Sequence, residues 1–511
     1  MKITKIKIEN FRSFKDEIEI DFNDLNVFVG KNDIGKSTIL EALDIFFNEN
    51  DGAIKMDKDD VNKRAIEAGD DEIKISVVFA DFPEELTIDA TNPTSLSDEY
   101  LLNSDGCLEI VKKYPKAGKE KVFIKAHHPT NDSCSELLLK KISDLKKVLT
   151  DGNIDCTDKT KSAVIRNSIW QHYAGDLQLS EIEIDVTKED AKNIWEQLRK
   201  YMPLYTLFQS DRDNSDGDSE VQDPMKLAVK EILKDSDLSD KLDSVAQEIK
   251  VKLGEVASKT LEKLNEMNSD IADSLTPVIP DSDKLKWADV FKNVSITGDD
   301  NIPINKRGSG VKRLILLNFF RAEAERRRAE KGAPSVIYAI EEPETSQHQE
   351  HQRKLIEAFK ELSNADNTQI LLTTHSPSVV KLLDFEHLQL VKGGDIKEIV
   401  DIEKNTLCYP SLNEVNYLAF GESDEEYHNE LYGYIESEQL LNEFYKDKTT
   451  MVYIPENKDG SQKEEQDKIL SEYIRHQIHH PENKRNTRFS HEQLQISIDE
   501  MRKFIEANTA D

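Results

Sequence analysis

The residues with the clearest chemical potential lie near the start of the chain. Residues 30–38 read Gly-Lys-Asn-Asp-Ile-Gly-Lys-Ser-Thr and directly follow the apolar run Leu25–Val29. The spacing G-x-x-x-x-G-K-S lets a glycine-containing loop turn its backbone N–H groups onto nucleotide phosphates. Lys36 would then reach the β/γ oxygens, and Ser37 would hold Mg²⁺. A plain glycine turn is the alternative, but an apolar strand before the loop and an amphipathic helix over residues 37–47 favour the phosphate site.

Carboxylates follow an apolar stretch far downstream. Residues 336–340 read Val-Ile-Tyr-Ala-Ile and lead into Glu-Glu-Pro-Glu at 341–344. A buried strand that ends in acids is what a Walker B element requires. Glu341 would anchor the Mg²⁺ water shell, and Glu342 would polarise the attacking water. A surface acidic run is the alternative, and the upstream phosphate loop disfavours it.

A histidine follows another apolar stretch. Residues 369–372 form a predicted strand, and Thr-Thr-His-Ser-Pro occupies 373–377. Such a histidine is often a capping or core residue. Here the strand should end at the same sheet edge as the phosphate loop, so we predict that His375 senses the γ-phosphate.

A Gly-Ser-Gly tripeptide at 308–310 precedes the apolar stretch 314–320. Glycine and serine at a helix N-terminus form an anion-binding end that one phosphate loop does not need. We therefore expect Ser309 and Gly310 to contact the nucleotide of another subunit.

The elements that must position these residues alternate between strand and helix patterns. Ile3, Ile6 and Ile8 alternate with polar residues, and 73–79 reads as a further strand. From about 83 to 280 the chain is mostly polar and helix-favouring. Within it, apolar residues between Leu242 and Ile271 recur mostly at three- and four-residue steps or their sums. This pattern favours long amphipathic helices that pack on each other or on a second subunit, and an insert with only an internal core is equally compatible.

Composition limits the classes of function. The 511 residues include 100 acidic and 68 basic side chains, which give a formal net charge of −32. Such a charge argues against a protein whose whole surface follows nucleic acid. The four cysteines are widely spaced without a C-x-x-C pair, so neither a zinc site nor a disulfide framework is indicated. No run of about 18 apolar residues occurs, so we expect a cytoplasmic protein without membrane contact.

The order of these motifs resembles the ABC-type ATPase heads of the SMC, RecF and overcoming-lysogenisation-defect (OLD) group, and the Asn-Phe-Arg-Ser-Phe opening at 10–14 is similar to that group too. The resemblance implies an α/β P-loop head, split by a large helical insertion, that binds ATP and Mg²⁺ and dimerises around ATP. It implies that Glu342 is catalytic and that His375 contacts the γ-phosphate. Glu341 stands where the group usually has Asp; its extra methylene moves the carboxylate by about 1.5 Å, so we expect looser Mg²⁺ binding and slow turnover. The residues implied in nucleotide binding are Asn32, Gly35, Lys36, Ser37, Thr38, Ser309 and Gly310, with Ser37 and Glu341 at the metal.

The tail after residue 408 lacks the βα alternation of the TOPRIM domain that an OLD-type nuclease would carry. It reads as an all-α module with helices over 412–420, 425–437, 464–479 and 491–507. Near the end of the third helix, Arg475 and His480 resemble the R-x4-6-H motif of HEPN ribonucleases. His480 would be the base near a ribose 2′-OH, and Arg475 would stabilise the phosphorane. Five residues span about 140° of a helix, so a distorted last turn or a site paired across a dimer is required.

Two other interpretations of this helix end stay open. Lys484, Arg485 and Arg488 add local positive charge, and a solvated basic helix end closed by Pro481 is the main alternative to the ribonuclease site, which remains the leading interpretation. A metal site at the neighbouring histidines lacks a carboxylate or Cys ligand.

These patterns predict four parts: an ATPase lobe at 1–82, a mainly helical insertion and dimerisation domain at 83–289, a second ATPase lobe at 290–408, and a helical HEPN-like tail at 409–511. The leading hypothesis is a bacterial anti-phage, abortive-infection ATPase whose ATP-dependent dimer controls a ribonuclease tail acting on RNA, such as tRNA. In that hypothesis, ATP-bound dimerisation or a phage trigger read by the helical insertion brings two tails together or releases them. A regulatory ATPase scaffold that holds or activates a separate nuclease is the alternative. A RecF-like repair ATPase is a second alternative, disfavoured by the negative charge and the tail.

Overall fold

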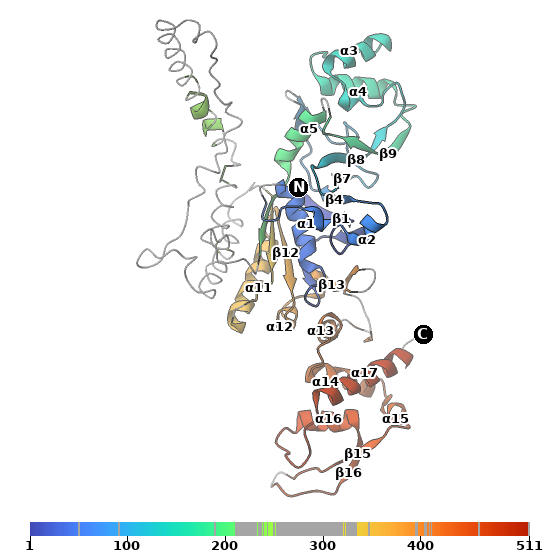
Figure 1. Cartoon of the computed structure of the whole chain (residues 1–511), viewed down its shortest axis with the longest axis vertical. Helices are drawn as coiled ribbons and strands as arrows, with labels where there is room; N and C mark the ends of the chain where they lie inside the picture. The colour runs from blue at the N-terminus through green and yellow to red at the C-terminus, as the bar shows by residue number, and fades with distance from the viewer. Residues whose placement is uncertain are drawn as a thin grey trace.

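The structure is a computed structural model. It describes residues 1–49, 52–89, 92–188, 191–209, 335–345, 348–393, 397–402, 406–407, 409, 411–457 and 460–508, with isolated positions between 232 and 322. Within these residues, two six-stranded sheets lie side by side, and a mainly helical C-terminal part lies at the far end of the molecule (Figure 1).

The first sheet is antiparallel and has the strand order β2-β1-β4-β7-β8-β9. Its inward side chains are mostly apolar, and along β8 the buried Val122, Ile124 and Ala126 alternate with more exposed positions that include Lys121 and Lys125. The strands are β1 (Lys2–Glu9), β2 (Ile18–Asp21), β4 (Glu72–Ala80), β7 (Leu108–Pro115), β8 (Lys121–Pro129) and β9 (Leu179–Asp185).

The second sheet has the order β10-β11-β12-β3-β13-β14, and all neighbours except β13 and β14 run parallel. Parallel strands are covered on both faces, which is why β3, β11 and β12 consist of buried residues throughout. The strands are β10 (Leu204–Phe208), β11 (Val336–Glu341), β12 (Thr368–Thr374), β3 (Leu25–Val29), β13 (Leu388–Lys392) and β14 (Glu398–Asp401).

Helices cover the two faces of the second sheet. On one face, Leu40 of α1 (Lys36–Asn48) shares a core with Phe28 of β3. On the other, Phe359 of α11 (Gln349–Ser363) packs with Val27 of β3. The predicted α/β class is therefore confirmed.

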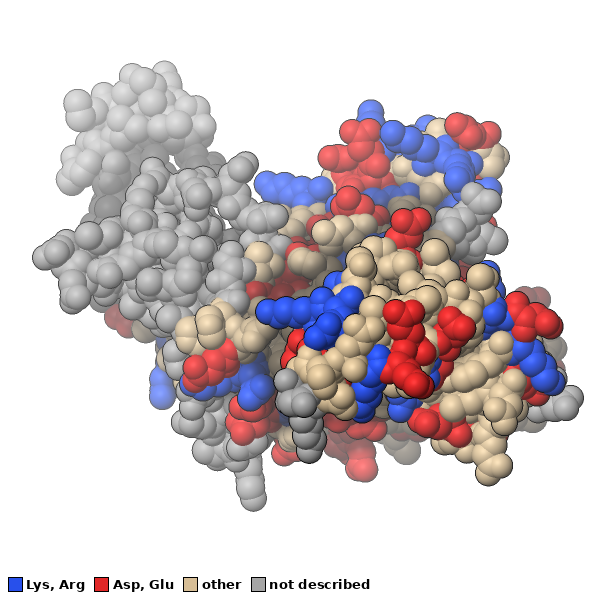
Figure 2. Space-filling view, turned by 90° about the horizontal axis from the view of Figure 1, so that it is seen from below, with Lys and Arg blue, Asp and Glu red and all other residues tan. Residues whose placement is uncertain are grey.

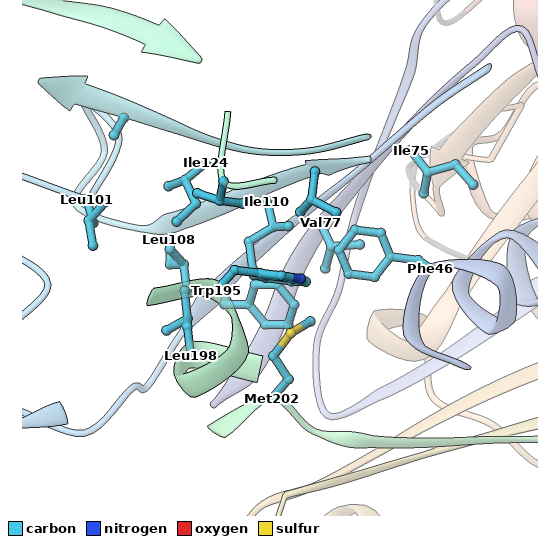
Figure 3. Close-up of a cluster of buried hydrophobic side chains, with 14 of the residues drawn as sticks. Phe46, Ile75, Val77, Leu101, Leu108, Ile110, Ile124, Trp195, Leu198 and Met202 are labelled. Atoms are coloured by element: carbon cyan, nitrogen blue, oxygen red, sulfur yellow. The ribbon is translucent and has the colours of Figure 1, made fainter. Parts of the chain in front are cut away.

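The first core joins α1 to the antiparallel sheet. Figure 3 shows Phe46 of α1 and Trp195 of α5 (Ala191–Leu198) gathered with Val77, Ile110 and Ile124 from β4, β7 and β8. Burying each such side chain contributes about 1.5–3 kcal/mol. This cluster fixes the helix that begins at the phosphate loop.

The predicted mainly helical character does not hold for residues 83–209. Besides β7, β8, β9 and β10, this stretch contains β5 (Leu86–Asp89) and β6 (Asn92–Thr94), with α3 (Ile142–Asp151), α4 (Ser162–His172) and α5 between them. The strands escape a composition-based prediction because their outward positions are charged. The amphipathic pattern between Leu242 and Ile271 lies mostly outside the described residues.

The C-terminal part is helical apart from one strand pair. The predicted helices at 412–420, 425–437 and 491–507 are confirmed. The helix predicted from 464 begins only at residue 470, because residues 466–469 pair with residues 450–453, so this part is not all-α. Its elements are α13 (Leu412–Phe420), α14 (Glu425–Ser437), α15 (Leu441–Phe444), β15 (Thr450–Tyr453), β16 (Gln466–Ile469), α16 (Leu470–His479) and α17 (His491–Asn508). No helix in the described part of the chain is long and apolar enough to cross a bilayer.

Helix α13 belongs to two cores at once. Val415 and Ala419 are buried in the core of the parallel sheet, whereas Tyr417 packs against the core formed by α14, α16 and α17. In Figure 1, α13 lies between α12 (Pro377–Val380) and those C-terminal helices. The boundary predicted at residue 409 thus precedes a helix that ties the two parts together.

Candidate nucleotide site

The predicted strand–loop–helix arrangement is confirmed at residues 25–48. β3 ends at Val29, and α1 begins at Lys36 after the N-cap residue Gly35, whose φ is 108°. Residues with a side chain rarely adopt this backbone conformation. A Cβ at Gly35 would also lie 3.1 Å from the Ser13 Oγ and 3.2 Å from the Lys397 Nζ. The backbone conformation therefore favours glycine here, and the two close side chains would have to shift slightly for any larger residue.

Lys36 is held over its own loop. Its Nζ donates hydrogen bonds of 2.8 Å to the carbonyl oxygens of Gly30 and Lys31, and only 4% of the residue is exposed. Burial lowers the pKa of Lys36, and the carboxylates of Glu342 and Glu344 oppose this shift. The ammonium is thus positioned near both acids and can exchange loop carbonyls for phosphate oxygens.

Glu341, the predicted first Walker B acid, is buried beside the strand that leads to His375. Glu341 pairs with Thr373 in the parallel register of β11 and β12, and β12 in turn neighbours β3. All three strands therefore end at one edge of the sheet, as the sequence predicts. Glu341 is 7% exposed, which suits a ligand inside a closed site better than a surface acid.

Glu342 adopts an uncommon backbone conformation with φ of 42°. Such a conformation costs about 1–3 kcal/mol for a residue with a side chain and persists where neighbours impose it. Here the backbone N–H of Glu342 donates to the Thr373 carbonyl over 3.0 Å. The conformation brings Glu342 Oε1 to 3.0 Å from His375 Nδ1, so the structure joins the two predicted catalytic residues.

Ser37 and Glu341 offer a hydroxyl and a carboxylate oxygen, the hard donors that Mg²⁺ prefers. Ser37 lies in the first turn of α1, and Glu341 ends β11. The donor set fits Mg²⁺ bound jointly by protein and phosphate oxygens. Among the described residues, no group of three or more His, Cys, Asp or Glu side chains is arranged to hold a metal ion.

The remaining predicted nucleotide ligands divide into two sets. Asn32 is exposed on the loop and Thr38 is buried in the first turn of α1, and their contact with a phosphate stays a prediction. Ser309 and Gly310 lie outside the described residues.

A cleft of about 880 Å³, which sequence reasoning did not find, is lined by residues 12–19, 59, 61–64 and 397–400 and reaches the loop through the contact of Lys397 with it. Arg12, Ser13 and Phe14 line one side and Lys397 lines the other, where the Lys397 Nζ donates to the Ile34 carbonyl over 2.6 Å. Arg12 forms ion pairs with Glu41 of α1 and with Asp60. The Asn-Phe-Arg-Ser-Phe segment thus contacts the phosphate loop directly, and the cleft has room for a base and ribose.

Gln209 is a second residue that sequence reasoning missed. It follows β10 directly, and the register pairs Phe208 with Ile340 one residue before Glu341. Its amide group therefore belongs to the same sheet edge as the Walker B acids. The available signal was an apolar run that ends in a polar residue. This signal is weak, because the segment contains many such runs.

Arg475 and His480 have different neighbours. The Arg475 Nη2 donates to Glu436 over 2.9 Å, and its guanidinium carbon lies 4.3 Å from the ring centre of Tyr432. His480 instead stacks on His476, and its Nδ1 lies 3.2 Å from Glu482. Arg475 is therefore engaged with α14, and the structure does not join the predicted base and cation.

The basic residues near His480 are largely engaged within the chain. Arg488 pairs with Glu425 at 2.5 Å and donates to the Gln477 carbonyl, and Arg485 donates to the Gly460 carbonyl over 2.7 Å. Figure 2 shows acidic and basic side chains interspersed on the face seen from below, where the C-terminal part lies in Figure 1. These arginines therefore offer less free charge to a nucleic acid than the sequence indicates.

One family model and several known proteins are similar to this chain. The family described as AAA ATPase domain matches residues 1–380. Endonuclease GajA of Bacillus cereus (strain VD045) is 23% identical over 407 residues, which cover 78% of this chain and 59% of that protein, so the chain spans less than two thirds of this relative's length. The SMC head domain from Thermotoga maritima is 12% identical with a TM-score of 0.32, covering 79% of this chain and 100% of that one. An SmcHead bound to the C-winged helix domain of ScpA is 15% identical with a TM-score of 0.34, covering 78% and 98%.

Proposed function

Because the chain belongs to the AAA ATPase domain family, we propose that it is an ATP-driven regulator of a bacterial anti-phage defence system. The contact of Glu342 with His375, 3.0 Å apart at the strand ends beside the phosphate loop, carries the hydrolytic part of this proposal. The similarity to an endonuclease supports a role connected with cleavage of nucleic acid, and the defence setting is our proposal. Hydrolysis would set how long the ATP-bound state lasts.

In this proposal each residue of the site has one task. Lys36 and the loop N–H groups bind the phosphates, and Ser37 and Glu341 hold Mg²⁺, which neutralises charge on the phosphate oxygens when bound. Glu342 orients and polarises the attacking water, and His375 contacts the γ-phosphate. The cleft between Arg12 and Lys397 receives the nucleoside.

We further propose that the site is completed by a second copy of the chain. The side chains of His375 and Glu342 are 39% and 25% exposed, so the described residues of one copy leave the catalytic pair open to water. Efficient phosphoryl transfer needs a site closed against bulk solvent. Ser309 and Gly310 of a partner, placed over the γ-phosphate, would supply that closure and make the dimer depend on ATP.

Helix α13 offers the route from the nucleotide site to the C-terminal helices. Asn416 Nδ2 donates to the carbonyl of Pro377, two residues after His375, over 3.3 Å. Lys381, at the end of α12, pairs with Asp424 at 3.4 Å and with Glu426 at 2.5 Å. On the other side of α13, the Tyr417 hydroxyl contacts Gln495 and Asp499 of α17. A shift of His375 on ATP binding would therefore move groups that touch α14 and α17.

Hydrogen exchange tests this route. In the wild type, a non-hydrolysable ATP analogue with Mg²⁺ should slow amide exchange in α14 by roughly fivefold or more, the size of a coupling of about 1 kcal/mol. Lys381→Glu places a like charge against Asp424 and Glu426, so it should abolish this effect while analogue binding is retained. The exposed Lys446→Glu serves as control. An unchanged response in Lys381→Glu, or no response in the wild type, contradicts the route.

For the C-terminal part, we propose a docking module that activates a separate effector nuclease. The engagement of Arg475 with Glu436 and Tyr432 favours this role over RNA cleavage by the chain itself. A ribonuclease tail acting on tRNA is the second candidate, supported by the exposed His480 stacked on His476.

Expression of the chain alone in phage-challenged cells separates the two roles. We expect no tRNA cleavage, and we expect His480→Ala and the control His491→Ala to protect cells alike when the full system is present. If the chain alone cleaves tRNA and His480→Ala lowers cleavage by about 10²-fold or more, as removal of a general base should, the ribonuclease role replaces the docking role.

A further inference from the structure

We propose that Glu344 is a positioning residue for ATP hydrolysis, which tethers the switch histidine to the Walker B segment. The inference rests on the proposed roles of Glu342 and His375 and assigns a task to the third acid of the Glu-Glu-Pro-Glu sequence. Glu344 itself touches neither nucleotide nor water in this scheme.

One carboxylate oxygen of Glu344 receives two hydrogen bonds from the switch segment. Its Oε1 accepts from the Thr374 hydroxyl over 2.6 Å and from the His375 backbone N–H over 3.3 Å. The same oxygen lies 4.0 Å from His375 Nδ1. The end of β12 is thereby bound to the loop that follows β11, through a side chain only 5% exposed.

The backbone of Glu344 is itself hydrogen-bonded to α11. The backbone carbonyl of Glu344 accepts a hydrogen bond of 3.3 Å from Gln352 Nε2, on α11. Between Glu341 and Glu344 the chain contains Pro343, whose fixed φ limits how the loop can relax. The loop therefore connects a fixed helix to the switch segment.

Two links between the segment after β11 and the end of β12 hold Glu342 beside His375. The backbone N–H of Glu342 is bound to Thr373, and the neighbouring residues Thr374 and His375 are bound to Glu344. The left-handed conformation of Glu342 stores strain that this double link can maintain. Without Glu344, only the link through Thr373 remains, and the 3.0 Å approach of Glu342 to the imidazole is no longer fixed.

The second oxygen of Glu344, Oε2, is buried and has no hydrogen-bond partner among the described residues. Burial raises the pKa of Glu344, whereas the Thr374 hydroxyl opposes the rise. A glutamine would keep the acceptor at Oε1 and change only this second atom. The tether therefore depends on an acceptor oxygen at the Oε1 position, and Glu344→Gln should preserve it.

The test measures steady-state ATP hydrolysis and nucleotide binding for Glu344→Ala, Glu344→Gln and Thr374→Val in the full chain. We expect Glu344→Ala to lower kcat by roughly 10- to 100-fold, the usual effect of losing about 1 Å of precision in catalytic geometry, with KM for ATP within about threefold. Glu344→Gln should keep kcat within about threefold, because it keeps both hydrogen bonds. A fold defect would raise KM and lower nucleotide binding as well, so this split distinguishes positioning from stability.

A double-mutant cycle adds a second criterion. Because Thr374→Val removes a donor to the same oxygen, Glu344→Ala combined with Thr374→Val should be no slower than Glu344→Ala alone. Glu350→Ala removes an exposed acid of α11 that pairs with Lys354, and it should leave kcat unchanged.

Unchanged kcat in Glu344→Ala, an equal loss in Glu344→Gln, or additive losses in the double variant overturn the proposal. Lys36→Ala, measured in parallel, distinguishes a failure of this proposal from a failure of the proposed nucleotide site. If Lys36→Ala still hydrolyses ATP at the wild-type rate, it is the assignment of the whole site that fails.

Discussion

Glu342→Gln is expected to lower the rate of ATP hydrolysis by roughly 10²- to 10⁴-fold, the usual contribution of a group that moves a proton in the transition state. The amide has nearly the shape of the carboxylate and keeps a position for contact with His375, so ATP affinity should change by no more than about threefold. The variant should therefore accumulate the ATP-bound state. Single-turnover experiments measure the rate of hydrolysis. Light scattering with ATP and Mg²⁺ measures the mass of the ATP-bound state, which should be that of a dimer.

The matched control is Glu350→Gln, which makes the same chemical change on an exposed face of α11. It should leave the hydrolysis rate and the ATP-dependent mass unaltered. Unchanged hydrolysis in Glu342→Gln would reject its assignment as the catalytic carboxylate. A variant that binds ATP but remains a monomer would reject the closure by Ser309 and Gly310 of a partner.

Lys36→Ala is expected to weaken ATP binding by roughly 30- to 150-fold, because a charged hydrogen bond to phosphate contributes about 2–3 kcal/mol. The variant also leaves the carbonyls of Gly30 and Lys31 without the donor that holds the loop. Hydrolysis at subsaturating ATP should fall at least in proportion. Fluorescent-nucleotide titration measures the affinity directly.

Lys354→Ala removes the same charge from an exposed position and should bind ATP as the wild type does. Comparable affinity in Lys36→Ala and Lys354→Ala would contradict the phosphate site. Thermal melts of both variants check that the loss of loop hydrogen bonds has not unfolded the ATPase core.

The nucleotide site was predictable because its signals are local. The loop at 30–38, the acids at 341–344 and the histidine at 375 each follow an apolar strand, and parallel strands bring such ends together whatever lies between them. The contact of Glu342 with His375 needed the structure, since nothing in the sequence reports a positive φ at Glu342. The tether by Glu344 likewise depends on a side-chain direction that no motif records.

The differences between the sequence-based predictions and the structure have identifiable physical causes. β7 contains Glu109, Lys112 and Lys113 and β8 contains Lys121 and Lys125, so their composition is similar to that of a solvated helix even though their alternation is that of a strand. α13 looked like the start of a separate module because its apolar residues do not reveal that two cores share them. For Arg475, the partner Glu436 lies far away in the sequence, and such a pairing is invisible without the fold.

The adjacency of β10 and β11 has a consequence for how such a chain can be rebuilt. The two strands are parallel neighbours, so the path from residue 209 to residue 335 leaves and re-enters the sheet at fixed points one strand apart. A crossover of about a dozen residues would meet that requirement, and each doubling of a flexible loop costs only about 0.6 kcal/mol in closure entropy. The sheet therefore constrains the two ends of this segment more than its length, so a sensor domain could be inserted near the junction if Phe320, which packs on Phe208, Tyr338 and Phe359, and the Gly-Ser-Gly stretch were kept.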